Sequence, residues 1–480
     1  MQRKRFYLTQ LTKFGFETLM YLSLFVAYFG MLSITNYAML TLSRTAGTTM
    51  ATFVVAMTLL TVVYGGYDVE QKKKRSVFAG ISLATLFTDL ITYIMLQIMN
   101  TNPNNPEANA TLTLWSEDLV LMLGAFALQL CFIYFFTSMG YRVYYKINPP
   151  QDCCIITSSQ ELAQHVAEKI SLYRKHYRLT EVVHFECPDI RQTIRSHEVI
   201  FLAGIPDTEE ALLMDYGYKH NKTTYLMAEM EDVVISTAGQ QILDDTPFLR
   251  IRRPQPTLFQ RIAKRACDIG VSLIGLIAAG PIMLITAAVL KSQGNGSVLF
   301  RQKRATLNGT VFEIIKFRTM YEDAGNFSAR ADDDRVTPVG RFLRKYRIDE
   351  LPQLINVLRG EMSLVGPRPE MLENVDRYTR EVPEFRYRQQ MKAGLTGLAQ
   401  IEGKYNTTPK DKAMLDLLYI ENFSLSYDFK LILRTLTIFF RRDSTEGFHD
   451  KKVACPVMRV TAREYPATQD TPPSSVSAAL

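Results

Sequence analysis

Long runs without charge dominate the first 145 residues of the chain. Three of these runs contain no Lys, Arg, Asp or Glu, and a fourth contains one charged residue, Asp89; they cover residues 18–43, 45–67, 76–99 and 119–141. Each run reaches the roughly 20 apolar residues that a helix needs to cross a bilayer. The pattern predicts four transmembrane helices within residues 1–147. The first run is too long for a cleaved signal peptide.

Basic residues mark one side of these predicted spans. They precede the first run in "MQRKR", separate the second and third in "KKKR" (72–75), and follow the fourth at Arg142 and Lys146. The loop over 100–118 has none. Basic residues stay in the cytoplasm, so both ends of the region are expected there, with four crossings of the membrane. Asp89 is read as a polar residue facing other helices, in preference to part of an ion path.

Short apolar strands then alternate with helical patterns over residues 148–255, after the breaker "NPP". This order predicts a small α/β domain with a parallel sheet. The turn after its first strand reads "ITSSQEL" and lacks the glycines that cradle a dinucleotide phosphate. We therefore expect a degenerate Rossmann-like domain with a structural or regulatory role.

A further apolar run, residues 269–290, has no charge and is long enough to form a fifth span. Pro281 lies near its middle, and an internal proline removes a helix hydrogen bond and kinks the helix. Basic residues flank both ends of the run, so a crossing would leave one cluster outside. We favour a re-entrant helix over 258–292, broken at Pro281, and keep a spanning helix as the alternative.

The remaining sequence is expected to form one compact domain, residues 256–440, followed by a disordered tail over 441–480. Asn308-Gly309 predicts the turn of a β-hairpin, on whose second strand Lys316 and Arg318 share one face. Thr337 and Pro338 predict the start of a helix.

Asp349 and Glu350 stand side by side among basic residues: Arg341, Arg344, Lys345, Arg347 and Arg359. One interpretation is a helix start with acids at its positive end and a solvated basic face. The other is a site for an anionic substrate. Arg368 lies between two prolines in "GPRP", a stiff loop suited to bidentate phosphate recognition, and Gly394 and Gly397 permit close backbone approach to a ligand.

These features favour a diphosphate substrate with Mg²⁺. One carboxylate would act as nucleophile, kept ionised by the arginines, and the other would hold the ion. The net charge of +7 fits anionic partners such as phosphates or lipid. The six cysteines have no metal-like spacing and are expected to be reduced. We expect no nucleic-acid partner.

At this point the sequence resembles a known family. The segments "FEIIKFRTM", "VTPVGRFLRKYRIDELPQLINVLRGEMSLVGPRPE" and "GLTGLAQIEGKYN", with the apolar run before them, look like those of bacterial polyprenyl-phosphate glycosyl-1-phosphate transferases. The resemblance covers about residues 258–440. It implies a large monotopic phosphoglycosyl transferase: an α+β membrane protein with four N-terminal transmembrane helices, a degenerate Rossmann-like domain and a monotopic catalytic domain with a re-entrant helix.

The resemblance also implies roles for single residues. Asp349 matches the family's nucleophile and Glu350 its Mg²⁺-associated partner. Pro281 matches the break of the re-entrant helix. The other residues expected to bind substrate or phosphate are Arg344, Arg368, Lys316, Arg318, Arg347, Gln400 and Asp416.

The activity implied is transfer of a sugar-1-phosphate from a UDP-sugar to undecaprenyl phosphate, with release of UMP, through a covalent aspartyl-phosphosugar intermediate. This step starts capsule, O-antigen or exopolysaccharide synthesis at the cytoplasmic face of the bacterial inner membrane. The implied partners are these two substrates and membrane lipid, and a homodimer is possible. Two alternatives stay open: an ordinary glycosyltransferase, which would release UDP, and a non-catalytic membrane scaffold.

Overall fold

The computed structural model describes residues 2–36, 39, 41, 43–99, 117–253, 255–293, 296–321, 334–403, 407–437 and 455–461. The chain forms two compact units. The first contains residues 1–144 and 229–449, and the second contains residues 145–228 and 450–480.

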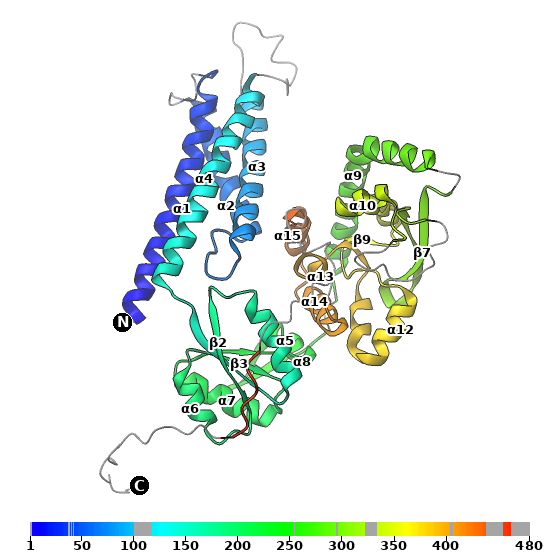
Figure 1. Ribbon diagram of the computed structural model, residues 1–480. Helices are drawn as coiled ribbons and strands as arrows, with labels where there is room; N and C mark the ends of the chain where they lie inside the picture. Colours follow the sequence, from blue (N-terminus) through cyan, green and yellow to red (C-terminus); the bar gives the residue numbers. More distant parts are fainter. Residues whose placement is uncertain are drawn as a thin grey trace. The chain divides into compact units, whose positions relative to one another are not determined.

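Four long helices open the first unit, as the sequence predicts: α1 (Gln2–Leu32), α2 (Arg44–Tyr64), α3 (Lys74–Met99) and α4 (Glu117–Ile147) (Figure 1). Each has the length and apolar composition of a membrane span. Asp89 of α3 is fully buried, and Gln129 of α4 donates to its Oδ1 at 3.3 Å. Asp89 therefore faces a neighbouring helix.

A parallel four-stranded sheet with the strand order β2-β1-β3-β4 forms the second unit. Its elements are β1 (Gln151–Thr157), α5 (Gln160–Ser171), β2 (Tyr177–His184), α6 (Ile190–Ser196), β3 (Val199–Ala203), α7 (Asp207–Lys219) and β4 (Thr223–Leu226). The last five residues of β1 are all buried, because helices cover both faces of such a sheet. The parallel sheet is as predicted, whereas α6 is too short to leave a clear periodic pattern in the sequence.

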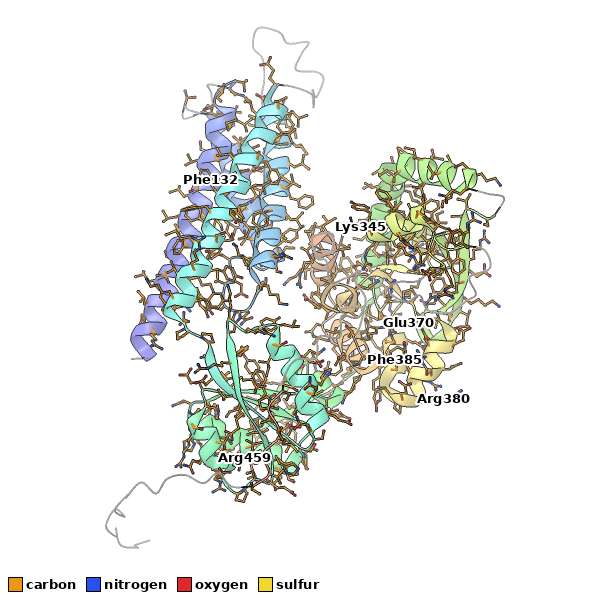
Figure 2. All side chains as sticks on the ribbon, viewed as in Figure 1. Phe132, Lys345, Glu370, Arg380, Phe385 and Arg459 are labelled. Atoms are coloured by element: carbon orange, nitrogen blue, oxygen red, sulfur yellow. The ribbon has the colours of Figure 1, made fainter. Side chains whose placement is uncertain are left out.

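A segment from the C-terminal region also belongs to this unit, and Figure 2 shows Arg459 among its side chains. Arg459 forms an isolated parallel bridge with Val183 of β2. Its side chain pairs with Glu181 at 2.7 Å and Asp189 at 2.6 Å. The sequence predicts a disordered tail over 441–480, yet residues 455–461 are held by these contacts. The other parts of the predicted tail, residues 441–454 and 462–480, lie outside the described residues.

Residues 229–255, which the sequence groups with the α/β domain, belong to the first unit. Met230 and Val233 of α8 (Met230–Ser236) pack in a cluster with Phe385 and Leu417. The antiparallel strands β5 (Gly239–Leu243) and β6 (Thr246–Arg250) follow.

Helix α9 (Leu258–Ser292) is a continuous helix with Pro281 inside it, and its ribbon bends sharply (Figure 1). It is the fifth helix long and apolar enough to cross a membrane in the described part of the chain. Its first half packs against α11 (Gln353–Arg359) and β9 (Ser363–Val365). In its second half, Leu290 packs with Phe317 and Leu343. Both halves therefore contact the same soluble region.

The predicted hairpin is formed by β7 (Leu299–Ala305) and β8 (Val311–Phe317), joined through η3 (Leu307–Gly309) with positive φ at Asn308 and Gly309. Thr337 caps α10 (Pro338–Lys345), also as predicted. The remaining elements are η4 (Ile348–Glu350), α12 (Leu372–Glu381), η5 (Pro383–Gln390), β10 (Gly394–Thr396), α13 (Leu398–Glu402), α14 (Pro409–Glu421) and α15 (Leu425–Thr435). A core formed around β8, α11, α13, α14 and α15 includes Val357, Met362, Tyr419 and Leu431.

Candidate active site

Asp349 and Glu350 lie in η4, a single 3-10 turn between α10 and α11. Arg347 precedes this turn with a φ of 53°, a left-handed conformation that is uncommon for a residue with a side chain. It ends α10 and lets the chain turn sharply. The pair is therefore presented by a tight turn between two helices, rather than by the first turn of a longer helix that the simpler interpretation requires.

Three cations surround the Glu350 carboxylate. Arg368 Nη2 donates to Glu350 Oε1 at 2.9 Å, and Lys316 Nζ lies 3.6 Å from the same oxygen. Arg347 Nη1 donates to Oε2 at 3.4 Å. The Glu350 side chain is 13% exposed. Residues from β8, from the turn before η4 and from the loop after β9 thus meet at one carboxylate.

The two adjacent acids differ in pKa as a result. Burial opposes the ionisation of Glu350, but Arg368, Lys316 and Arg347 outweigh it and hold the pKa of Glu350 well below its usual range. Burial and then the charge of Glu350 raise the pKa of Asp349 to about 6, although Lys316, Arg344 and Arg368 act to lower it. Glu350 is the fixed anion of the pair, and Asp349 titrates near neutral pH.

Polar contacts fix the turn against the hairpin. Asn356 of α11 is fully buried, accepts from the Ile315 backbone N–H at 3.0 Å and donates to the Glu313 carbonyl at 2.7 Å. Arg344 Nε donates to Thr319 Oγ1 at 2.9 Å. Gly340 allows this approach, because a Cβ there would lie 2.0 Å from the Thr319 carbonyl oxygen.

The glycines of "KAGLTGLAQ" have a different role from the predicted one. A Cβ on Gly394 would lie 2.1 Å from the Gly366 nitrogen, and one on Gly397 would lie 2.2 Å from the Gly366 oxygen. They allow close approach of the protein's own backbone, so that the segment around β10 packs against the "GPRP" loop. This contact supports the loop that carries Arg368.

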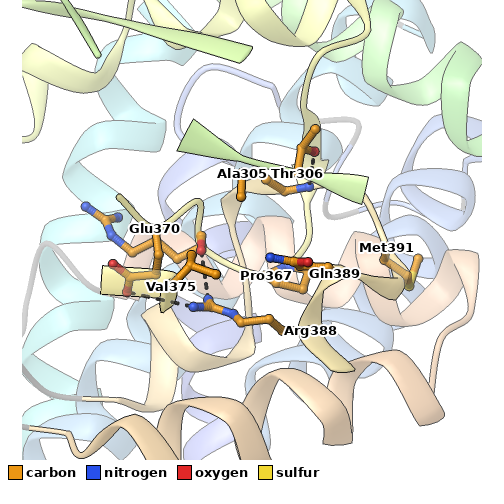
Figure 3. A pocket seen from close by; sticks show the side chains of 10 residues that line it. Ala305, Thr306, Pro367, Glu370, Val375, Arg388, Gln389 and Met391 are labelled. Carbon is orange, nitrogen blue, oxygen red and sulfur yellow. Dashed lines mark hydrogen bonds and ion pairs between the residues drawn. The ribbon is translucent and has the colours of Figure 1, made fainter. Parts of the chain in front are cut away.

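A recess of about 250 Å³, partly open to solvent, lies beside Arg368. Figure 3 shows Arg388 and Glu370 extending toward each other at its edge. Its lining residues are Ala305, Thr306, Pro367, Arg368, Glu370, Val375, Arg388, Gln389, Met391 and Ala393. Asp416, a predicted site residue, lies behind Arg388 and forms an ion pair with its Nη2 at 2.7 Å. Burial raises the pKa of Asp416 to about 6, despite this arginine.

The structure gathers most of the predicted site residues, but not all of them, at the acid pair. Glu350 is in direct contact with Lys316, Arg347 and Arg368, and Asp349 and Arg344 belong to the same cluster by their electrostatic coupling. Arg318 follows β8, where its backbone N–H donates to Val298. Gln400 of α13 donates to the Leu395 carbonyl at 2.9 Å, and Pro281 lies within α9. No contact of Gln400 or Pro281 with the acid pair is seen in the described residues.

Sequence reasoning missed Arg388 and Arg304. Arg388 lies in the polar run "EFRYRQQ", and the one available signal was its three-residue spacing from the apolar Phe385, which is fully buried. Arg304 of β7 donates to the Pro369 carbonyl at 3.4 Å, and burial lowers its pKa to about 10. Both arginines contact the "GPRP" loop through its backbone carbonyls, Arg304 at Pro369 and Arg388 at Arg368.

The acid pair alone supplies only part of the ligands that Mg²⁺ requires. No three His, Cys, Asp or Glu side chains gather as metal ligands within the residues that the structure describes. Mg²⁺ in phosphate-transfer sites commonly takes one or two carboxylates, with water and phosphate oxygens completing its shell. Asp349 and Glu350 supply that number, so the residues fit an ion that binds together with a diphosphate.

Comparison with known proteins adds independent information. Residues 259–442 match the bacterial sugar transferase family. The chain is 41% identical over 204 residues to a UDP-glucose:undecaprenyl-phosphate glucose-1-phosphate transferase of Caulobacter vibrioides, covering 41% of this chain and 76% of the relative.

Two further relatives match stretches of similar length. One, from Aeromonas hydrophila, is a UDP-N-acetylgalactosamine-undecaprenyl-phosphate N-acetylgalactosaminephosphotransferase, 40% identical over 187 residues, with 38% of this chain and 44% of the relative covered. The other is the exopolysaccharide production protein ExoY of Sinorhizobium fredii, 36% identical over 193 residues, with 36% and 84% covered. These matches show that the chain belongs to the bacterial sugar transferase family and is a phosphoglycosyl transferase.

Proposed function

We propose that the protein transfers a sugar-1-phosphate from a UDP-sugar to undecaprenyl phosphate and releases UMP. The observation that carries this proposal is the pair Asp349 and Glu350, in which three cations hold one carboxylate while the other titrates near neutral pH. The names of the relatives from Caulobacter vibrioides and Aeromonas hydrophila support the choice of donor and acceptor. The product would start an exopolysaccharide, capsule or O-antigen chain.

The pair divides the work. Glu350 is a poor nucleophile because Arg368, Lys316 and Arg347 occupy its oxygens. Asp349 is ionised above about pH 6 and is free of such a close ion pair in the described structure. In the first step an Asp349 oxygen attacks the β-phosphorus of the UDP-sugar. The bond between that phosphorus and the bridging oxygen breaks, and the electron pair leaves with UMP.

In the second step a phosphate oxygen of undecaprenyl phosphate attacks the phosphorus of the aspartyl-phosphosugar. The bond to Asp349 breaks, which restores its carboxylate and yields the lipid diphosphate sugar. Arg344, Arg368 and Lys316 would stabilise the negative charge that builds up on the phosphate oxygens in both steps. Glu350 would hold Mg²⁺ by giving up one of its contacts to Lys316, Arg347 or Arg368, and the ion would supply further charge neutralisation.

Helix α9 supports a membrane-bound acceptor. Its apolar side chains are largely exposed, among them Ile274, Ile277, Leu284 and Ile285. Its two halves pack against the same catalytic region on either side of the bend, which supports the re-entrant topology with the catalytic domain on the cytoplasmic face. Such a helix would bring a lipid phosphate and a soluble nucleotide sugar to one site.

The test is UMP release by the purified full chain with Mg²⁺, undecaprenyl phosphate and a panel of UDP-sugars. We expect UMP with at least one sugar, and none from Asp349→Asn. Asp376→Asn, the same change at an exposed position on α12, serves as the matched control and should retain activity. Release of UDP would instead support an ordinary glycosyltransferase. Turnover retained in Asp349→Asn would remove the role proposed for Asp349.

A further inference from the structure

Arg388 is among the most deeply buried cations in the described part of the chain, with 5% of its side chain exposed. Its Nη2 lies 2.7 Å from Asp416 Oδ2, and its Nη1 lies 3.8 Å from Glu370 Oε1. The guanidinium also lies over the Phe385 ring, 4.6 Å from its centre. Elements η5 and α14 and the loop before α12 therefore hold this side chain in one orientation.

The same guanidinium contacts the loop that carries Arg368. Arg388 Nη2 donates to the backbone carbonyl of Arg368 at 2.7 Å. The side chain of Arg368 in turn donates to Glu350 at 2.9 Å. An unbroken series of contacts thus runs from Asp416 through Arg388 and Arg368 to the acid pair.

Core stability alone does not account for this arrangement. A buried ion pair contributes little more than well-packed apolar side chains of the same size, because burying the charges is costly. Here the cation also binds a carbonyl in the middle of "GPRP", where prolines on both sides of Arg368 provide no N–H to hold the loop. The Arg388 side chain adds a hydrogen bond at this carbonyl, next to the bond that the Gly394 backbone N–H donates to the Pro367 carbonyl.

We propose that Arg388, oriented by Asp416, is a positioning residue that fixes the backbone at Arg368 and so directs the Arg368 guanidinium toward Glu350 and the substrate phosphates. The inference rests on the proposed function only for its kinetic test, since the contacts themselves are structural. Asp416 then acts at a distance: it orients Arg388 and does not bind substrate.

The kinetic test is a double-mutant cycle on UMP release by the full chain. Arg388→Ala should lower kcat/KM by about tenfold to a hundredfold, the scale expected when a binding group is displaced by about 1 Å. If Arg388 acts through Arg368, the double variant Arg368→Ala/Arg388→Ala should be within about twofold of Arg368→Ala alone. A merely structural role predicts that the two losses multiply, and that result would overturn the proposal.

Two further variants keep the cycle interpretable. Arg386→Ala changes an exposed arginine of the same element η5 and should leave kcat/KM near wild type. Arg388→Lys retains the charge and tests the case in which the alanine variant does not fold. The single ammonium of lysine lacks the fork that reaches both Asp416 and the carbonyl, but it keeps the charge. Arg388→Lys should therefore lose less kcat/KM than Arg388→Ala. In the Arg368→Ala background, Arg388→Lys should cause no further loss of kcat/KM.

Hydrogen exchange tests the positioning without any turnover. We expect the peptide that covers residues 363–371 to exchange faster in Arg388→Ala and Arg388→Lys than in wild type, and to be unchanged in Arg386→Ala. Unchanged exchange in both Arg388 variants would refute the proposal. If wild-type protein releases no UMP, the proposed function fails, and the exchange result still decides the role of Arg388.

Discussion

Two neighbouring carboxylates with opposite pKa shifts are the main result at the scale of single residues. Glu350 keeps its charge because three cations contact it, while burial and that same charge raise the pKa of Asp349 to about 6. Environments that separate the pKa values of two acids are a common sign of distinct roles in catalysis. The two residues are neighbours in the sequence, so only the fold distinguishes them.

The raised pKa of Asp349 predicts an acid limb in the pH profile. Because the ionised form is the nucleophile, kcat/KM should fall about tenfold per pH unit below pH 6 and level off above it. Arg344→Ala removes a cation that lowers this pKa, so its midpoint should lie at higher pH. Initial rates of UMP release across pH 4.5 to 8.5, at constant ionic strength, check both statements.

Ionisation of Asp349, which should raise activity, should lower the stability of the folded chain. The pKa of Asp349 is higher in the folded chain than its usual 3.8, so its ionisation costs stability as pH rises from about 4 to about 6. Asp349→Asn should therefore raise the melting temperature at pH 8 and leave it unchanged near pH 4. A midpoint of activity below about pH 4.5, or no difference in melting temperature at pH 8, would contradict this account.

Much of the site was predictable at this scale, and the reasons are physical. The residues around Asp349 and Glu350 were found because charges cluster there beside rigid prolines and glycines. Arg388 was not found, because its partner Asp416 lies on another helix and nothing local marks the pair. The function of Gly394 and Gly397 was misjudged, since a sequence does not say whether a close approach is made by a ligand or by the backbone.

At the scale of elements, the start of α9 is attached to the catalytic core by buried polar groups. Lys264 Nζ donates to Asp428 Oδ2 at 2.5 Å and to the Val365 carbonyl at 3.0 Å. Asp268 Oδ1 accepts from Ser363 Oγ and from the Leu364 N–H. Both sets of contacts end on β9, directly before the "GPRP" loop. Helix α9 and the loop that carries Arg368 are thus connected through one short strand.

Lys264→Met should be strongly destabilising. It leaves the Asp428 carboxylate, whose side chain is 9% exposed, without its cation, and breaking a buried pair costs about 3–5 kcal/mol. Thermal unfolding of the full chain in detergent measures the effect. Lys410→Met provides the matched control, because its pair with Glu229 is well exposed and should contribute less than about 1 kcal/mol. Equal shifts in melting temperature for the two variants would show that the buried ion pair contributes no more to stability than the exposed one.

The second question at this scale is whether α9 crosses the membrane or returns to the side from which it entered. The re-entrant topology places both ends of the helix in the cytoplasm. In a variant without its natural cysteines, Arg261→Cys and Lys291→Cys should each resist a membrane-impermeant maleimide added to intact spheroplasts. Both should react after the membrane is permeabilised. Labelling of either position from outside would establish a spanning helix instead.

Element boundaries show the limits of sequence patterns. Long apolar helices, the hairpin at Asn308-Gly309 and the cap at Thr337 were predicted because each depends on local preferences. The 3-10 turn at Ile348–Glu350 was not, because it depends on the left-handed conformation of Arg347, a residue that gives no such signal. Hydrophobic periodicity also fails for helices as short as α6.

At the scale of the whole molecule, the chain returns to its α/β unit through residues 455–461. Arg459 joins β2 through its backbone and binds Glu181, Asp189 and Thr193 through its guanidinium. These contacts are distant in sequence, so a composition that suggests disorder did not reveal them. The α/β unit is therefore assembled from two separate parts of the chain.

Arg459→Ala should release this segment. The change leaves Glu181 and Asp189, each with 11% of the side chain exposed, without a cation. We expect faster hydrogen exchange in β2 and earlier proteolytic removal of the C-terminal region. Arg178→Ala breaks an exposed pair with Asp152 in the same unit and should change neither. Unaltered exchange and proteolysis in Arg459→Ala would show that the segment is held by other contacts.

The central claim is that Asp349 carries the sugar phosphate between donor and acceptor. The most direct measurement is the intact mass of the purified enzyme after incubation with Mg²⁺ and its UDP-sugar, without undecaprenyl phosphate. The account predicts an added mass equal to one sugar phosphate, located on Asp349 by peptide mapping, together with an equal amount of UMP. Turnover that requires the acceptor from the start, with no adduct and with UDP as the product, would contradict it.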